Sequence, residues 1–164
     1  MAEMVIPIEG TEYSANAFDD LLEALAVRGD AATQGPIRGI LNELEVTGTS
    51  SPVSVASGWA WVKGKLYKNT STKSISVPTP SAQTRIDRIV LRLDYTGSPM
   101  TCEAVRLAGV EGSGSPPALT QTDGTTWEIS LAQLSVTTGG VITVTDEREF
   151  AGDGHVVTAS IADG

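Results

Sequence analysis

The chain has 164 residues, of which 40% are hydrophobic and 19% are charged. This composition is that of a globular protein and excludes an intrinsically disordered chain. The 20 acidic residues outnumber the 11 basic ones, and the formal net charge is −9. Because the basic residues are also scattered, and Asp87 lies between the arginine pair Arg85 and Arg88, we expect no nucleic acid partner.

The N-terminal residues 1–36 form the first predicted unit, an extended arm followed by a helix. Asn16 is suited to cap this helix and Gly29 to end it. We expect residues 1–36 to act in docking or oligomerisation, and packing against the protein's own sheet is the alternative. The apolar stripe of the helix, at positions i, i+3, i+4 and i+7, consists of Phe18, Leu21, Leu22 and Leu25.

Residues 37–150 carry the period-two pattern of half-buried strands. The clearest strand spans residues 85–95, where Ile89, Leu91 and Leu93 share one face. Many short strands predict a mainly β fold, an antiparallel β-sandwich or a partly open barrel, with one short N-terminal α-helix. The Gly-rich residues 151–164 are expected to be a tail or linker. The other apolar runs centre on Leu44 and Val46, Val53 and Val55, Trp59 to Val62, Leu66 and Tyr67, Ile75 and Val77, Val105 and Leu107, Trp127 to Leu131, and Ile142 and Val144.

Residues with catalytic or metal-binding chemistry are few and form no recognisable motif. His155 is the single histidine, so no second histidine completes a metal site, and no phosphate-binding or dinucleotide-binding glycine loop occurs. We therefore expect no catalytic residue, no metal and no cofactor. Cys102 is the only cysteine, which excludes an intrachain disulfide and leaves a disulfide between chains open.

No stretch of the sequence indicates export or membrane insertion. Residues 1–9 lack a basic region followed by a long apolar core, and no apolar run approaches transmembrane length. We expect a product that is made and kept in the cytoplasm, or that leaves the cell by a route without a signal, such as lysis.

Carboxylates on or next to the predicted strands are the groups that a glycan-cleaving enzyme would use as an acid and base pair. Ion pairing with nearby arginines is the interpretation we favour. Strict alternation puts Asp87 on the apolar side of its strand, where Arg148 is its candidate partner. A buried Asp87–Arg148 pair would fix strand register, and its loss would cost about 3–5 kcal/mol. Arg88 completes the predicted set of ion-pairing residues. The carboxylates are Asp87, Asp94, Asp146 and Glu147.

Trp59, Trp61 and Trp127 are the aromatic residues best suited to a ligand or an interface. Trp59 and Trp61 are two positions apart, so both point to the same face of a regular strand. Exposed together, they could stack on sugar rings and form a carbohydrate-binding surface. The alternative is that they fill the core or a subunit interface, because tryptophan contributes a large buried area.

Five ordered blocks of the sequence resemble a family of virion structural proteins of tailed bacteriophages and prophages. The final block ends in Val144-Thr-Asp-Glu-Arg148, where the family pattern carries Ile in place of Val144. Distinctive runs in the earlier blocks are Gly58-Trp-Ala-Trp-Val62 and Arg85-Ile-Asp-Arg88. The five blocks lie at residues 53–69, 85–94, 117–122, 127–136 and 141–148.

This resemblance implies a non-enzymatic component of a phage tail, either a baseplate protein or a tail-fibre anchoring or adaptor protein that supports host attachment. It implies other tail or baseplate proteins as partners, a homo-oligomer with a trimer favoured, and a host surface glycan as a further ligand. It also implies a place in the virion tail after assembly in the host cytoplasm. A carbohydrate-binding module and, ranked last, a glycan-cleaving enzyme are the alternatives.

Overall fold

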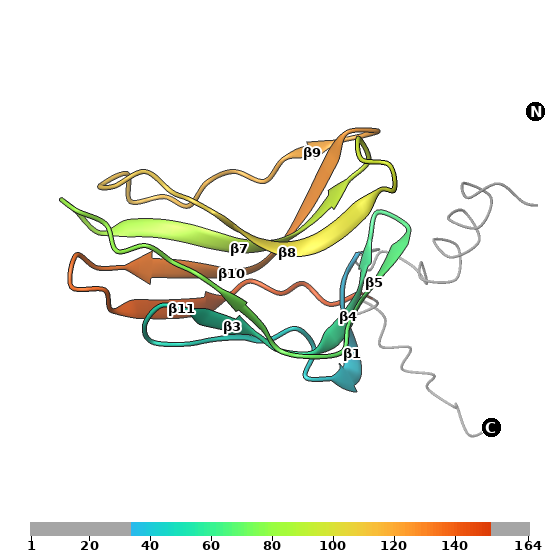
Figure 1. Cartoon of the computed structure of the whole chain (residues 1–164), viewed down its shortest axis with the longest axis horizontal. Coiled ribbons are helices and arrows are strands. Elements are labelled where there is room, and N and C mark those ends of the chain that lie inside the picture. The colour runs from blue at the N-terminus through green and yellow to red at the C-terminus, as the bar shows by residue number, and fades with distance from the viewer. Residues whose placement is uncertain (1–33, 152–164) are drawn as a thin grey trace, which may run out of the picture.

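The structure is a computed structural model that describes residues 34–151, shown in colour in Figure 1. The described residues form eleven strands and no helix, so the predicted mainly β fold is confirmed. The predicted docking helix, with Phe18, Leu21, Leu22 and Leu25, lies outside the described residues, as does the predicted tail after Ala151. The first strand begins at Gly35, two residues ahead of the predicted start of the β domain.

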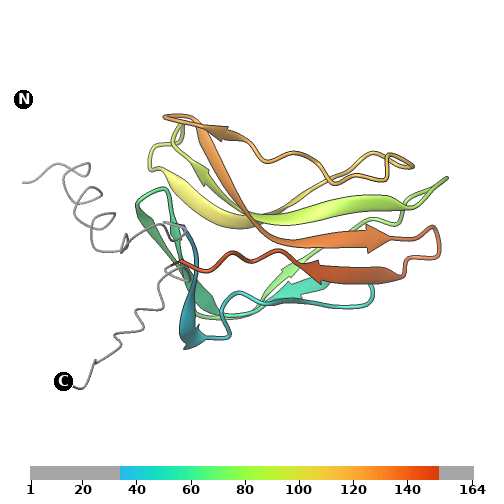
Figure 2. The ribbon, with the colours of Figure 1, turned by 180° about the vertical axis from the view of Figure 1, so that it is seen from behind.

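All strand pairs are antiparallel, and they form three open sheets (Figures 1 and 2). The first sheet has the order β1-β4-β5, from Gly35–Leu41, Gly58–Val62 and Lys65–Asn69. The second has the order β2-β3-β6, from Val46–Thr47, Val53–Val55 and Lys73–Ile75. The large sheet has the order β11-β10-β7-β8 with β9 beside β10, from Ile142–Asp146, Thr126–Val136, Arg85–Asp94, Thr101–Leu107 and Gln121–Thr122.

One apolar cluster collects side chains from all three sheets. The alternation predicted for residues 85–95 is observed, because Ile89, Leu91 and Leu93 point into this core while Arg88 and Arg92 alternate with them. Fully burying one such aliphatic side chain contributes about 1.5–3 kcal/mol. The other members with no exposed surface are Leu44, Val53, Val55, Ala60, Val62, Leu131, Ala132 and Leu134.

The strand predicted around Leu44 and Val46 is shorter than the sequence pattern indicated. Leu41, Glu43 and Leu44 have φ angles of 58°, 54° and 59°, so the chain turns here and only Val46–Thr47 is a strand. Leu44 is nevertheless fully buried, and its backbone N lies 3.3 Å from the carbonyl O of Ser57. The apolar alternation at Leu44 and Val46 therefore indicated that these side chains are buried, but it did not indicate an extended backbone.

A β-bulge in β10 decides which side chains reach the outer face of the large sheet. The pairing of β10 with β7 shifts between Ser130 and Ala132, which leaves Leu131 as an extra residue. In a regular strand, residues three positions apart point to opposite faces. The bulge instead puts Ser130 and Gln133 on one face, away from the core, where both reach the carboxylate of Glu147.

The two ends of the described chain lie side by side at β1 (Figure 2). The backbone N–H of Ala151 donates to the carbonyl O of Pro36 at 3.0 Å. Gly35 lies against the same returning segment, because a Cβ added there would sit 1.7 Å from the carbonyl O of Glu149. Only glycine permits this close approach together with its φ of +139°.

Candidate functional site

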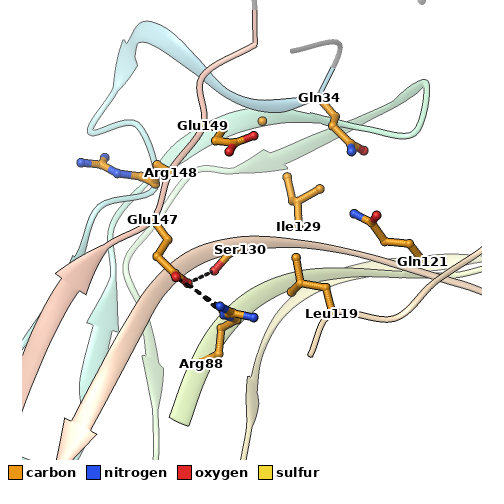
Figure 3. A pocket seen from close by; sticks show the side chains of 10 residues that line it. Gln34, Arg88, Leu119, Gln121, Ile129, Ser130, Glu147, Arg148 and Glu149 are labelled. Carbon is orange, nitrogen blue, oxygen red and sulfur yellow. Dashed lines mark hydrogen bonds and ion pairs between the residues drawn. The ribbon is translucent and has the colours of Figure 1, made fainter. Parts of the chain in front are cut away.

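A polar pocket of about 470 Å³ lies beside β10 of the large sheet (Figure 3). Its walls come from segments that are far apart in the sequence, which the fold brings together. Polar side chains dominate, and Leu119 and Ile129 are its apolar members. The lining residues are Gln34, Gly35, Arg88, Leu119, Gln121, Ile129, Ser130, Glu147, Arg148 and Glu149.

Glu147 is the centre of the hydrogen-bond network at the base of this pocket. Arg88 binds both of its carboxylate oxygens, Nε at 2.9 Å and Nη2 at 3.1 Å. The hydroxyl of Ser130 donates to Glu147 at 2.6 Å, and the amide of Gln133 donates to the other oxygen. Arg88 also donates through Nη1 to the carbonyl O of Pro117 at 2.7 Å, so one guanidinium joins three segments.

Burial alone would raise the pKa of Glu147, but the hydrogen bonds from Arg88, Gln133 and Ser130 outweigh it, and the net pKa lies below the ordinary value. Glu147 is therefore ionised at neutral pH and acts as an acceptor. A carboxylate in this state has no proton to donate to a leaving group.

Three side chains around the opening keep hydrogen-bonding groups that the described residues leave unused. Gln34 accepts a bond from the indole Nε1 of Trp127 at 2.7 Å, which leaves its amide N–H groups toward the pocket. Gln121 donates to the carbonyl O of Glu128 at 3.0 Å, which leaves its amide oxygen. Glu149 makes no side-chain hydrogen bond to another described residue. In Figure 3 these three side chains lie around Ile129.

The three tryptophans lie outside the pocket lining and in two different settings. Trp59 and Trp61 are half-buried and share one face of β4, as their spacing predicts. Trp127 in β10 borders the pocket only through its bond to Gln34, and the Nζ of Lys63 lies 4.4 Å from its ring centre. A sugar-stacking role for Trp59 and Trp61 stays a prediction.

The predicted Asp87–Arg148 pair is wrong, although Asp87 is fully buried as expected. Arg85 binds Asp87 through Nε at 2.7 Å and Nη2 at 3.0 Å, and Arg106 binds it at 2.7 Å. The backbone N–H of Gly109 donates a further bond at 2.8 Å. These bonds occupy both carboxylate oxygens of Asp87, and Arg148 is held elsewhere by its own partners.

Arg148 instead binds Asp146, with Nε at 2.9 Å and Nη2 at 2.7 Å, and donates to the carbonyl O of Glu43 at 3.1 Å. All three residues predicted to form ion pairs therefore do so: Asp87 with Arg85 and Arg106, Arg88 with Glu147, and Arg148 with Asp146. Ion pairing, the preferred interpretation of these carboxylates, is confirmed for Asp87, Asp146 and Glu147.

The other carboxylates considered as catalytic acids are held in the ionised state too. Burial would raise the pKa of Asp87, but its bonds from Arg85, Gly109 and Arg106 bring it below the ordinary value. The Arg148 side chain lowers the pKa of Asp146, and the hydroxyl of Thr96 lowers that of Asp94. An acid and base pair needs one carboxyl with a raised pKa. None of these four provides one.

Sequence reasoning missed two charged residues of this network, Arg106 and Glu128. Arg106 reaches Asp87 only through the pairing of β8 with β7, and the sequence does not state that register. Glu128 is 1% exposed, and it binds Arg92 at 2.7 Å and the backbone N of Thr120 at 2.7 Å. The available signal for Glu128 was its place as the single acidic residue between Trp127 and Ile129. Its burial depends on the segment around Thr120, and that segment carries no strand pattern in the sequence.

Comparisons with protein-family models, with curated proteins and with solved structures found no match. Within residues 34–151, no group of three or more His, Cys, Asp or Glu side chains is placed to hold a metal ion. The same part of the chain contains no helix with the length and apolar character needed to cross a bilayer. The function is therefore inferred from the geometry of this chain and from its sequence blocks.

Proposed function

We propose that this chain is a non-enzymatic structural component of a phage tail, an anchoring or adaptor protein of the baseplate or fibre. The observation that carries the proposal is that four of the five blocks resembling tail proteins meet in one bonded network. Arg88 of the second block binds Glu147 of the fifth and Pro117 of the third. Arg92 of the second block binds Glu128 of the fourth. Charged residues that bind one another across the blocks fix how the blocks pack. The blocks that resemble tail proteins therefore include residues that determine this fold, which supports a shared architecture.

The finer architecture within this proposal is a β-sandwich, in which the two small sheets lie against the large one. Its support is the shared core, where Val55 of β3, Val62 of β4 and Leu91 of β7 belong to one cluster. The homotrimer, the partner proteins of the tail and the location in the virion belong to the same proposal. The ionised carboxylates described above support its non-enzymatic character.

Immunogold electron microscopy tests this proposal on particles released from the source organism by prophage induction. An antibody against the purified chain is expected to label the tail end distant from the head. Light scattering on the same purified chain is expected to give the mass of a trimer. Gradient-purified tailed particles that carry no antigen would refute the proposal, whereas a monomeric mass alone would remove only its oligomeric part.

A second candidate, a carbohydrate-binding module, is favoured by the polar pocket. Gln34, Gln121 and Glu149 offer amide donors, an amide acceptor and a carboxylate around an apolar floor, as a polyhydroxylated ligand requires. Calorimetric titration with oligosaccharides from host cell walls tests it. Gln121→Ala is expected to weaken binding at least tenfold, with the exposed Gln83→Ala as the matched control. Equal affinities of the two variants, or no heat at all, would refute this candidate.

A further inference from the structure

The outer face of the first sheet carries large apolar side chains that do not enter the core. In β4, Gly58, Ala60 and Val62 are buried toward the core, so Trp59 and Trp61 point to the opposite side. The register places Leu66 of β5 beside Trp61 and Lys68 beside Trp59. Leu66 is 46% exposed. We name Trp59, Trp61 and Leu66 the tryptophan face.

The indole N–H of Trp59 indicates that something further lies on this face. This nitrogen is buried, yet it has no hydrogen-bond partner among the described residues. Buried donors in native proteins nearly always have an acceptor, because losing water without replacement is costly. Lys68 lies 4.6 Å from the ring centre of Trp59 and cannot serve, since an ammonium group has no acceptor. The acceptor therefore comes from outside the described residues.

The N-terminal segment of the same chain ends beside this face. Gly35, the first residue of β1, pairs directly with Trp61. The thirty-three residues before Gln34 therefore continue from the edge of the tryptophan face. The connection from Leu25 to Gly35 can span up to about 30 Å when extended, which exceeds the width of a three-stranded sheet.

The chemistry of residues 18–25 complements that of the tryptophan face. The predicted stripe of Phe18, Leu21, Leu22 and Leu25 needs an apolar surface, and the sheet offers two indoles and a leucine. The opposite side of the same segment is polar, with Asp19, Asp20 and Glu23, as expected where the other side faces solvent. We propose that residues 18–25 of the same chain cover the tryptophan face, and that this segment supplies the acceptor for the Trp59 indole.

Disulfide cross-linking in the full-length chain tests this proposal and identifies the occupant. The double variant Leu22→Cys/Leu66→Cys is expected to form an intrachain disulfide on mild oxidation, read by non-reducing electrophoresis and peptide mass spectrometry. Leu21→Cys and Leu25→Cys, each with Leu66→Cys, extend the scan along the stripe. The matched control is Glu23→Cys/Leu66→Cys on the acidic side, expected to react about tenfold more slowly because its Cβ points away. Cys102 is left in place, since burial raises the pKa of its thiol to about 12.

Two outcomes overturn the proposal. Stripe positions that cross-link no faster than Glu23→Cys would show that residues 18–25 lie elsewhere. Disulfides that form between chains when the Leu22→Cys and Leu66→Cys single variants are mixed would show that a second copy covers the face.

Tryptophan fluorescence provides an independent reading without new cysteines. Leu21→Asp/Leu22→Asp is expected to shift the emission to longer wavelength and to increase acrylamide quenching, whereas Asp19→Asn leaves both unchanged. In a Trp59→Phe/Trp61→Phe background, where Trp127 is the remaining tryptophan, the same aspartates are expected to cause no shift. An unshifted emission of the aspartate variant, with a native circular dichroism spectrum, would contradict the proposal.

Discussion

Arg88 in β7 and Glu147, which follows β11, form a two-pronged ion pair across the intervening strand β10. The two residues are 59 positions apart, and their side chains are only 14% and 21% exposed. The bulge at Leu131 makes this pair possible, because it presents Ser130 and Gln133 to the same carboxylate. Three strands of the large sheet are thereby fixed relative to one another.

Arg88→Ala is expected to lower the free energy of unfolding by about 2–3 kcal/mol, because it leaves the partly buried charge of Glu147 without its main partner. Urea denaturation followed by circular dichroism measures the change. Lys73→Ala is the matched control, since Lys73 forms an exposed pair with Glu103 at 3.2 Å and should contribute less than about 1 kcal/mol. Equal losses in both variants would contradict a special role for Arg88.

Asp87→Ala is expected to cost about 3–5 kcal/mol, since it leaves Arg85 and Arg106 facing a site with no counter-charge. A double-mutant cycle measured by urea denaturation separates the partners. Asp87 and Arg106 are expected to show a coupling energy, whereas Asp87 and Arg148 are expected to be additive. Coupling to Arg148 would restore the pair that the structure rejects.

In acid, the free energy of unfolding of the wild-type protein is expected to fall more steeply than that of the Asp87→Asn variant. The folded-state pKa of Asp87 lies below its ordinary value of 3.8, so the ionised group contributes stability that is fully present above pH 3.8. This contribution is lost as the pH falls from 3.8 through the folded-state pKa. The free-energy difference between the wild type and Asp87→Asn, measured by urea denaturation at pH 7 and at pH 2.5, should shrink at the lower pH. A constant difference would argue against the pKa shift.

Gly58→Ala is expected to cost about 1–3 kcal/mol, because a Cβ there would lie 2.4 Å from the backbone N of Leu44 and 2.9 Å from its Cγ. The turn that buries Leu44 would have to move. Gly139→Ala is the control, since its nearest neighbour would be the hydroxyl of Thr137 at 3.8 Å. Thermal denaturation of the two variants should separate them, and a neutral Gly58→Ala would contradict the described turn.

Cys102 is expected to resist alkylation in the folded protein. Burial, with the charge of Glu103 adding to it, raises the pKa of the thiol from 9.0 to about 12. The thiolate is the reactive form, so iodoacetamide at pH 8 should react about a thousandfold more slowly than in the urea-unfolded chain. The buried, protonated thiol of Cys102 in the folded chain also disfavours a disulfide between chains, which the sequence alone left open. Rapid alkylation of the folded chain would show that the thiol is more accessible than the structure indicates.

The strands were predictable where polar and apolar residues alternate over several positions. Residues 85–95 show this pattern, and β7 occupies almost the same range, from Arg85 to Asp94. Leu44 and Val46 show the limit of the method. Two apolar residues separated by one polar residue satisfy a period of two, but a turn with positive φ can bury both as well.

The candidate site was much less predictable than the strands. That Asp87 is buried and ion-paired followed from its position on the apolar side of β7, but the identity of its partners depends on strand order and register. Gln34 and Gln121 line the pocket, yet each is a single polar residue with no local pattern. Gln34 takes its place through a bond from Trp127, 93 residues away, and Gln121 through a bond to the carbonyl O of Glu128.

The contact between Pro36 and Ala151 sets how this domain would behave under mechanical load. The first and last described residues of the domain lie next to each other, so the domain adds little to the distance between the segments that flank it. A pulling force applied through those segments meets the bond between Trp127 and Gln34 and the Pro36–Ala151 hydrogen bond before it reaches the core. Exchanging the whole domain for another with equally close ends would leave the spacing of the flanks almost unchanged.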